Sequence, residues 1–353
     1  MATKRQEKTL EMSGGSVPQS EMALKPTSVR SRFSSAIGDW WIVGILAVFI
    51  VLFSVLSPGF FSLSNFSSVT SSAAETLILA VAETFVILTG GIDLSVGAIL
   101  GLSGMVSGYV MESALALGPT ASLVIGIAAG VLCGALLGLV NGYVIAYMNV
   151  TPFITTLGML TIATGFTFLI TNGRDIVNLP PQLGNIGNTA WLNLFTVPFI
   201  VTVVIVVLAA IWLRRTRFGR YTYAVGSNPE GARRSGIDLK KHLLKIYTLA
   251  GALSGIDGVL ILARLVSGSP LAGQNDELNA IAAVVIGGAS LFGGRGNVIK
   301  SFIGGLIVAV LTNGLVIMGV QAYWQMVAIG VIIIVAVFVD QRRNRNNSRN
   351  VET

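Results

Sequence analysis

The stretch TGGIDLSVGA, residues 89–98, interrupts a strongly apolar part of the chain with an aspartate and several glycines. The segment LILAVAETFVIL precedes it, and ILGLSGMVSGYVM follows it. Apolar segments of about 20 residues are long enough to cross the hydrocarbon core of a bilayer as helices. The stretch therefore raises the question of why a charged residue, Asp93, lies between two such segments.

The composition of the whole chain is that of a membrane protein. Hydrophobic residues make up 53% of its 353 residues, charged residues make up 11%, and the mean hydropathy is +0.78. The runs Trp41–Leu56, Ser122–Tyr147 and Val197–Leu213 are continuously or nearly continuously apolar, whereas a membrane β-barrel has short alternating segments. The sequence thus predicts an all-α, polytopic membrane protein.

Ten segments are candidate transmembrane helices. They are 40–57, 72–90, 94–112, 120–148, 152–171, 196–213, 244–266, 278–292, 298–319 and 323–340. Almost no polar sequence separates the second span from the third, so the GGIDL residues between them form either a tight hairpin or a break within the membrane.

Basic residues gather in three places and set the predicted topology. Of the Lys and Arg residues, six precede Gly38, nine lie between Arg214 and Lys245, and four follow Asp340. The positive-inside rule places these clusters in the cytoplasm, and an even number of spans agrees with this. The connections 173–195 and 267–277 then lie outside. The net charge of +7 therefore reflects topology and not nucleic-acid binding.

The same pattern divides the chain into three parts. Residues 1–38 are predicted to be a disordered cytoplasmic arm, because Ser, Pro and Gly are scattered through them. Residues 39–340 form the transmembrane domain, with a central loop at 214–243. Residues 341–353 are predicted to be a basic cytoplasmic tail.

Two roles are open for Asp93. A charge near the bilayer centre costs roughly 2.5–3.5 kcal/mol, so it normally faces a bundle interior, a water-filled path or a helix end. Asp93, Ser95 or both are suited to cap the following helix, because Asp and Ser accept hydrogen bonds from free N–H groups there. Alternatively, Asp93 lines a substrate path, and the two roles are compatible. Thr89, Gly90 and Gly91 belong to the same predicted helix break, where glycine permits close packing and positive φ.

The residue inventory argues against enzyme chemistry. Cys133 is the only cysteine and His242 the only histidine, so a thiolate metal site or a Ser/His/Asp triad has no basis in the sequence. His242 lies in a basic stretch and is expected on a solvated face. The glycine-rich stretch VVIGGASLFGGRGNVIKSFIGG resembles a phosphate loop, but the chain has no Gly-Lys pair, so a Walker A lysine is absent. Any ATP-driven function needs a partner chain.

The central loop contains the signals of a short, well-capped helix. Asn228 is a suitable N-cap, Pro229 suits the first helical position, and Glu230 favours the positive end of the helix dipole. Arg233 and Arg234 favour the negative end, and Gly236 can terminate the helix. Two interpretations remain open. The loop docks a partner, or it is a solvated basic loop that only fixes the topology.

Several motifs in one order carry a family resemblance. TGGIDLSVGA, GSNPEGARRSGI, the LARL of Leu262–Leu265, ELNAIAAVVIGGASLFGGRG and TNGLVIMGVQAYWQM closely resemble permease subunits of bacterial ABC importers for ribose, xylose, arabinose, galactose and related polyols. The resemblance covers roughly residues 45–340. It implies a permease dimer in the bacterial inner membrane, with two ATP-binding cassette units and a periplasmic sugar-binding protein, and with no cofactor in this chain.

The resemblance also assigns the central loop a role. The segment Ser227–Gly236 matches the family's coupling segment, which transmits the ATPase cycle to the spans. Its expected coupling residues are Ser227, Asn228, Pro229, Glu230, Arg233, Arg234 and Gly236.

The chain departs from the family pattern at Glu83, Asp257 and Asn279. Glu83 and Asp257 stand where uncharged residues are more usual, and Asn279 replaces an aspartate that commonly follows Glu277 and Leu278. The two acids indicate an unusual polyol or cationic ligand, or an ion pair with Arg264. With Asp93, they also fit a second function class, an ion-coupled secondary transporter in which these carboxylates bind the coupling ion.

Overall fold

The computed structural model describes residues 29–192 and 194–349. The chain divides into two units, 1–40 and 41–353, and the first contributes only the beginning of helix α1 to the described residues. Because α1 begins at Val29, residues 29–38 are helical, although composition predicts a disordered arm there. Residues 1–28 of that arm lie outside the described residues. Helix α13 likewise continues into the predicted tail, as far as Arg349.

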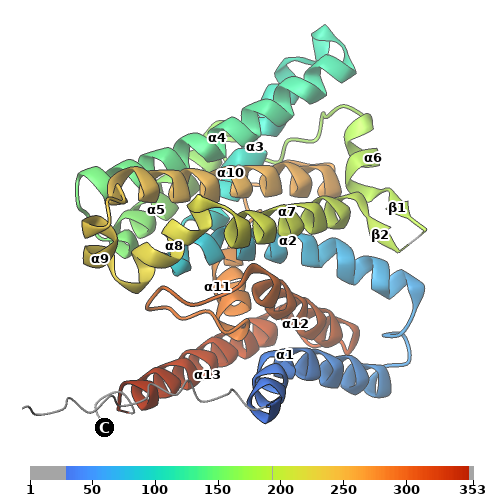
Figure 1. Cartoon of the computed structure of the whole chain (residues 1–353). Coiled ribbons are helices and arrows are strands. Elements are labelled where there is room, and N and C mark those ends of the chain that lie inside the picture. Colours follow the sequence, from blue (N-terminus) through green and yellow to red (C-terminus); the bar gives the residue numbers. More distant parts are fainter. Residues whose placement is uncertain (1–28, 193, 350–353) are drawn as a thin grey trace, which may run out of the picture. The chain divides into compact units, whose positions relative to one another are not determined.

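The second unit is almost entirely helical in the part described (Figure 1). Its elements are α1 (Val29–Leu56, from residue 41 on), α2 (Leu63–Leu88), α3 (Val96–Ser113), a 3₁₀ turn (Leu115–Leu117), α4 (Pro119–Tyr147), α5 (Pro152–Thr171), α6 (Gln182–Asn188), β1 (Ala190–Trp191), β2 (Phe195–Thr196), α7 (Val197–Arg215), α8 (Arg217–Ser227), α9 (Pro229–Arg234), α10 (Leu239–Leu265), α11 (Asp276–Ile286), α12 (Val298–Ile317) and α13 (Ala322–Arg349).

Among the described residues, six helices are long and apolar enough to cross a membrane, namely α2, α4, α5, α7, α10 and α12. Trp41–Leu56 and Ala322–Val335 are shorter apolar helices. These eight correspond to eight of the ten predicted spans. The other two predicted spans correspond to α3 and α11, which are not among these helices. Helix α3 has 18 residues. Helix α11 has only 11 residues, or about 16 Å, which is half the thickness of a hydrocarbon core. The polytopic helical class is confirmed, and the number of ten spans stays a prediction.

Glycine spacing explains why α4 and α10 lie along each other (Figure 1). Buried glycines recur at every fourth position of α4, at Gly126, Gly130, Gly134, Gly138 and Gly142. A Cβ on Gly134 would lie 2.3 Å from the Gly251 carbonyl oxygen, and one on Gly138 would lie 2.2 Å from that of Tyr247. Small residues allow such backbone approach where lipid supplies no hydrophobic driving force between helices.

The break between α2 and α3 is not a hairpin. Helix α3 packs against α4, α5 and α10 and makes few contacts with α2. Of the two arrangements open for GGIDL, the structure therefore has the helix break, after which the chain continues into a helix that, like α2, contacts α10 but packs little on α2 itself.

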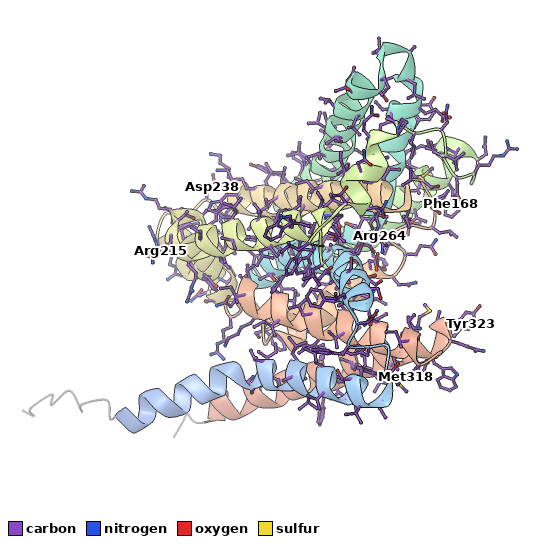
Figure 2. All side chains as sticks on the ribbon, turned by 90° about the vertical axis from the view of Figure 1, so that its right-hand side faces the viewer. Phe168, Arg215, Asp238, Arg264, Met318 and Tyr323 are labelled. Atoms are coloured by element: carbon purple, nitrogen blue, oxygen red, sulfur yellow. The ribbon has the colours of Figure 1, made fainter. Side chains whose placement is uncertain are left out.

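The two long connections predicted to lie together on one side do meet. Ile176 and Gly268 form an isolated antiparallel bridge, and the Asn188 side chain donates to the Arg264 carbonyl at 3.1 Å. Figure 2 shows Arg264 and Phe168 toward one end of α10, and Asp238 and Arg215 toward its other end. The central loop and these connections thus lie at opposite ends of the helices that join them.

Candidate translocation path and coupling segment

The turn between α2 and α3 is built by local hydrogen bonds. The amides of Thr89 and Gly91 both donate to the Val86 carbonyl, at 3.0 and 3.3 Å, and the Gly90 amide donates to that of Ile87 at 2.9 Å. Gly90 has φ of +83°, a conformation that favours glycine. The expectation that Gly91 also needs positive φ is wrong. Gly91 instead gives space to Tyr247, whose hydroxyl oxygen would lie 2.4 Å from an added Cβ.

Asp93 is fully buried and stabilises the turn that precedes α3. Its Oδ1 accepts from the Ser95 amide at 2.9 Å and from the Ser95 hydroxyl at 2.5 Å. Of the two residues suited to cap α3, Ser95 occupies the N-cap position, but its side chain caps no amide of α3. Asp93 lies two residues before this N-cap, and its side chain accepts from the Ser95 amide and hydroxyl and from no amide of α3. It fixes Ser95, which in turn begins the helix.

Around Asp93, the structure gathers polar groups whose hydrogen-bonding capacity is only partly used. The Asp93 amide donates to Glu83 Oε1 at 3.1 Å, and Asn141 Nδ2 donates to Ser95 Oγ at 2.8 Å. Within the described part of the chain, four buried atoms here have no hydrogen-bond partner: Glu83 Oε2, Asp93 Oδ2, Asn141 Oδ1 and Tyr247 Oη. Sequence analysis found Glu83 and Asp93 but missed Asn141 and Tyr247, which lie on the helices α4 and α10.

Arg264 pairs with Glu75 of α2 and with neither Glu83 nor Asp257. Of the two alternatives open for Glu83 and Asp257, an ion pair with Arg264 is therefore wrong, and an unusual ligand stays a prediction. Asp257 is fully buried, and both its carboxylate oxygens lack a partner among the described residues. Glu75 was missed, although it lies inside the predicted span 72–90 and is as unusual there as Glu83.

Helix α9 confirms the predicted capping of the central loop. Asn228 Oδ1 accepts from the Gly231 amide at 2.8 Å, and Pro229 is the first helical residue. At the other end, Gly236 has φ of +83°. Glu230 pairs with both Arg233 and Arg234, at 3.1 and 3.2 Å, and all three side chains are more than half exposed.

The next helix, α10, is also capped. Asp238 Oδ1 accepts from the Lys241 amide at 3.0 Å, and its other oxygen pairs with the Lys241 ammonium at 3.1 Å. The hydrogen bonds from the Lys241 backbone and side chain hold the pKa of Asp238 below its ordinary value.

His242 is not on a solvated face, as its basic neighbours suggested. It is only 4% exposed, its Nε2 lies 3.0 Å from the Thr222 hydroxyl, and its ring packs against Phe218. It thus joins α8 to α10. No group of three or more metal-ligating side chains occurs among the described residues.

The end of α8 contacts the end of α2 directly. A Cβ on Gly226 would lie 1.8 Å from the Leu88 carbonyl oxygen, which accepts from the Gly294 amide at 3.0 Å. Gly294 in turn lies against Ser227, and the Tyr223 hydroxyl donates to the Gly296 carbonyl at 2.8 Å. The glycine-rich segment that resembled a phosphate loop is therefore a packing element between α8, α2 and α12.

Comparison with known proteins gives close relatives. The ribose import permease protein RbsC of Escherichia coli strain K12 is 39% identical over 309 residues, covering 84% of this chain and 92% of the relative. The RbsC of Bacillus subtilis strain 168 is 40% identical, with 85% and 91% covered. The fructose import permease protein FrcC of Rhizobium meliloti is 39% identical, with 84% and 83% covered.

No solved structure matches the chain. The family described as "Branched-chain amino acid transport system / permease component" matches residues 65–337. Because that match spans well over half of the sequence, this chain belongs to that family of membrane permease components.

Proposed function

We propose that this chain is the transmembrane permease subunit of an ATP-binding-cassette importer for a monosaccharide or related small polyol. A periplasmic binding protein delivers the solute, and a separate chain binds and hydrolyses ATP, so this chain carries no cofactor. The names of the relatives support a sugar: they are import permeases for ribose and fructose, and a D-allose permease protein of Escherichia coli is 38% identical.

The observation that carries the proposal is the exposed, doubly capped helix α9 together with its contact to the transmembrane part. Arg233 and Arg234 are 70% and 80% exposed, so they are accessible to a partner although both pair with Glu230. The residues just before α9, Gly226 and Ser227, pack on the Leu88 carbonyl and on Gly294. A partner that moves α9 therefore acts on the end of α2, where the TGGIDL break begins.

The proposal includes the topology that the basic clusters predict: ten spans in the bacterial inner membrane, with both termini and α8–α9 in the cytoplasm. The bridge between Ile176 and Gly268 supports this arrangement, because it joins the two connections assigned to the outside. A second permease copy completes the pathway, as in the ABC importers that the sequence resembles.

One observation favours a second candidate, an ion-coupled secondary transporter. The buried oxygens of Glu83, Asp93 and Asp257 that lack partners are suited to bind a proton or a cation. The test is uptake of labelled D-ribose, D-allose and D-fructose into proteoliposomes that contain the complete transporter. Uptake that requires ATP and survives a protonophore supports the importer. Uptake without ATP that the protonophore abolishes supports the second candidate.

A further inference from the structure

The segment that precedes α11 runs inward along α3. A Cβ on Gly268 would lie 3.3 Å from the Met105 sulfur, one on Gly101 would lie 2.5 Å from the Ala272 carbonyl oxygen, and one on Gly97 would lie 2.5 Å from that of Gly273. At 1.5 Å per residue, the eight positions from Met105 back to Gly97 correspond to about 12 Å. The chain thus descends roughly two turns of α3 before α11 begins.

This descent ends halfway along a membrane-spanning helix. Gly104 of α3 packs on Gly258 of α10, and Gly91, just before α3, lies beside the Tyr247 hydroxyl. Gly97 therefore lies between the levels of residues 247 and 258 of α10, which runs from Leu239 to Leu265. Since α10 is long enough to span the membrane, the beginning of α11 lies near the midplane.

Irregular backbone at this depth is tolerated only where it is buried in protein or lines a water-filled cavity. Here it lines a cavity of about 210 Å³ between α3, α5 and the descending segment. The polar residues of its wall are Thr164, Thr167, Gln274, Asn275 and Glu277. Pockets for drug-sized ligands have about 300–1,000 Å³, so this cavity is of a size for a small solute such as a single sugar ring.

Glu277 is the charged residue of this wall. It is 9% exposed, and its Oε2 would lie 2.4 Å from a Cβ on Gly97, so the glycine of the TGGIDLSVGA stretch leaves room for the carboxylate. No other described residue donates a hydrogen bond to the Glu277 carboxylate. The Thr164 hydroxyl also has no hydrogen bond in the part of the chain described. Both groups are available to a ligand.

The charge of the wall distinguishes between ligand classes. None of the lining residues is Lys, Arg or His, and the nearby Arg264 is paired with Glu75. The carboxylate of an amino acid would lack a cationic partner here and would face Glu277. Sugar hydroxyls can instead donate to the Glu277 carboxylate and exchange hydrogen bonds with the hydroxyl and amide groups.

We infer that this cavity is a midmembrane subsite that binds a single neutral sugar during translocation, with Glu277 accepting hydrogen bonds from its hydroxyl groups and Thr164 contacting it from α5. The inference rests on the proposed import function and adds a location and a binding residue to it. It also explains why residue 97 is a glycine, because a side chain at that position would displace the Glu277 carboxylate.

The test uses the complete transporter in proteoliposomes, with labelled D-ribose as the probe. Glu277→Gln keeps the volume and removes the charge, and Thr164→Val keeps the shape and removes the hydroxyl. We expect uptake per permease to fall about tenfold in the first variant, since hydrogen bonds to charged groups are the stronger class, and about three- to fivefold in the second. Thr161→Val is the matched control. It lies on the same helix, its hydroxyl donates to the Leu157 carbonyl, it does not line the cavity, and its uptake should not change.

A chemical readout covers the case in which Glu277→Gln does not insert. In a Cys133→Ser background, Thr164→Cys should react with a small cationic methanethiosulfonate reagent, and high D-ribose should slow the reaction, whereas at Thr161→Cys ribose should have no effect. Two results would overturn the subsite, provided that the wild-type transporter imports ribose. One is normal uptake by both Glu277→Gln and Thr164→Val. The other is that ribose does not protect Thr164→Cys from the reagent. A wild type with no ATP-dependent uptake of ribose, allose or fructose overturns the proposed function instead.

Discussion

The role of Asp93 can be decided by comparing Asp93→Asn with Asp93→Ala. In the structure, one carboxylate oxygen accepts two hydrogen bonds from Ser95, at 2.9 and 2.5 Å, and the other has no partner. Asparagine keeps the first oxygen and replaces the second with an amide nitrogen. The Glu83 carboxylate lies next to Asp93, since it accepts from the Asp93 amide, so asparagine also removes one of two adjacent buried carboxylates. We therefore expect Asp93→Asn to retain substantial uptake.

Alanine leaves both Ser95 donors buried without their acceptor. Each unsatisfied buried donor costs about 1–3 kcal/mol, so the two together cost roughly 2–6 kcal/mol. That is a large part of the about 5–15 kcal/mol by which folded proteins are typically stable. Asp93→Ala should therefore lose most uptake and unfold at a lower temperature in detergent.

The assay is sugar uptake normalised to the amount of permease in the membrane, with thermal unfolding of the purified protein measured in parallel. Ser95→Ala is the matched variant, because it keeps the Ser95 amide donor to Asp93 and removes the hydroxyl, which donates to Asp93 and accepts from Asn141 Nδ2; it should lie between the other two in unfolding temperature. An Asp93→Asn protein that inserts and unfolds like the wild type but does not transport would refute this reasoning, and it would show that the negative charge itself is needed in the path.

Three further predictions test other parts of the molecule. The double variant Arg233→Glu, Arg234→Glu should insert normally but lose substrate-stimulated ATP hydrolysis and uptake, whereas unchanged coupling would remove the role of α9. A phosphatase that is active only in the periplasm should be inactive when fused after Thr353 and active when inserted near Asn185, and the reverse result would contradict the proposed topology. Gly91→Ala should lose uptake because its Cβ meets the Tyr247 hydroxyl, and Tyr247→Phe in the same chain should restore part of it; no restoration would mean that another contact makes Gly91 necessary.

The features that sequence predicted well depend on neighbouring residues. Asn228, Pro229 and Gly236 act within one or two turns of α9, so their cap, first-turn and termination roles can be read without knowing the rest of the fold. The polytopic class depends on composition alone. Gly90 was also recognised correctly, as part of a break that needs glycine, because the turn is closed by hydrogen bonds to Val86 and Ile87 nearby.

The features that sequence did not predict depend on helices that are distant in the chain. Nothing local indicates that Glu75 on α2 meets Arg264 on α10. His242 was misplaced because its basic neighbours were weighed more than its position on the helix face toward α8. The half-length of α11 was missed because the apolar run continues past Ile286, although Gly287 and Gly288, with φ of +80° at Gly288, mark the end of the helix.

The close backbone contacts at glycines explain how a movement of α9 would reach the transmembrane part. Side chains can absorb a small displacement by changing rotamer, but Gly226 meets the Leu88 carbonyl with no side chain between them. Packed interiors have little free volume to take up such a shift. A displacement of α8 must therefore either move the end of α2 or open this contact. Because α2 ends at Leu88 and the turn to Ser95 follows at once, moving it changes the position of Asp93 and of the first turn of α3, where Gly97 adjoins Glu277. The exposed helix and the cavity are thus connected through close contacts at Gly226 and Gly97, and chains of packed groups of this kind can carry coupling between two sites.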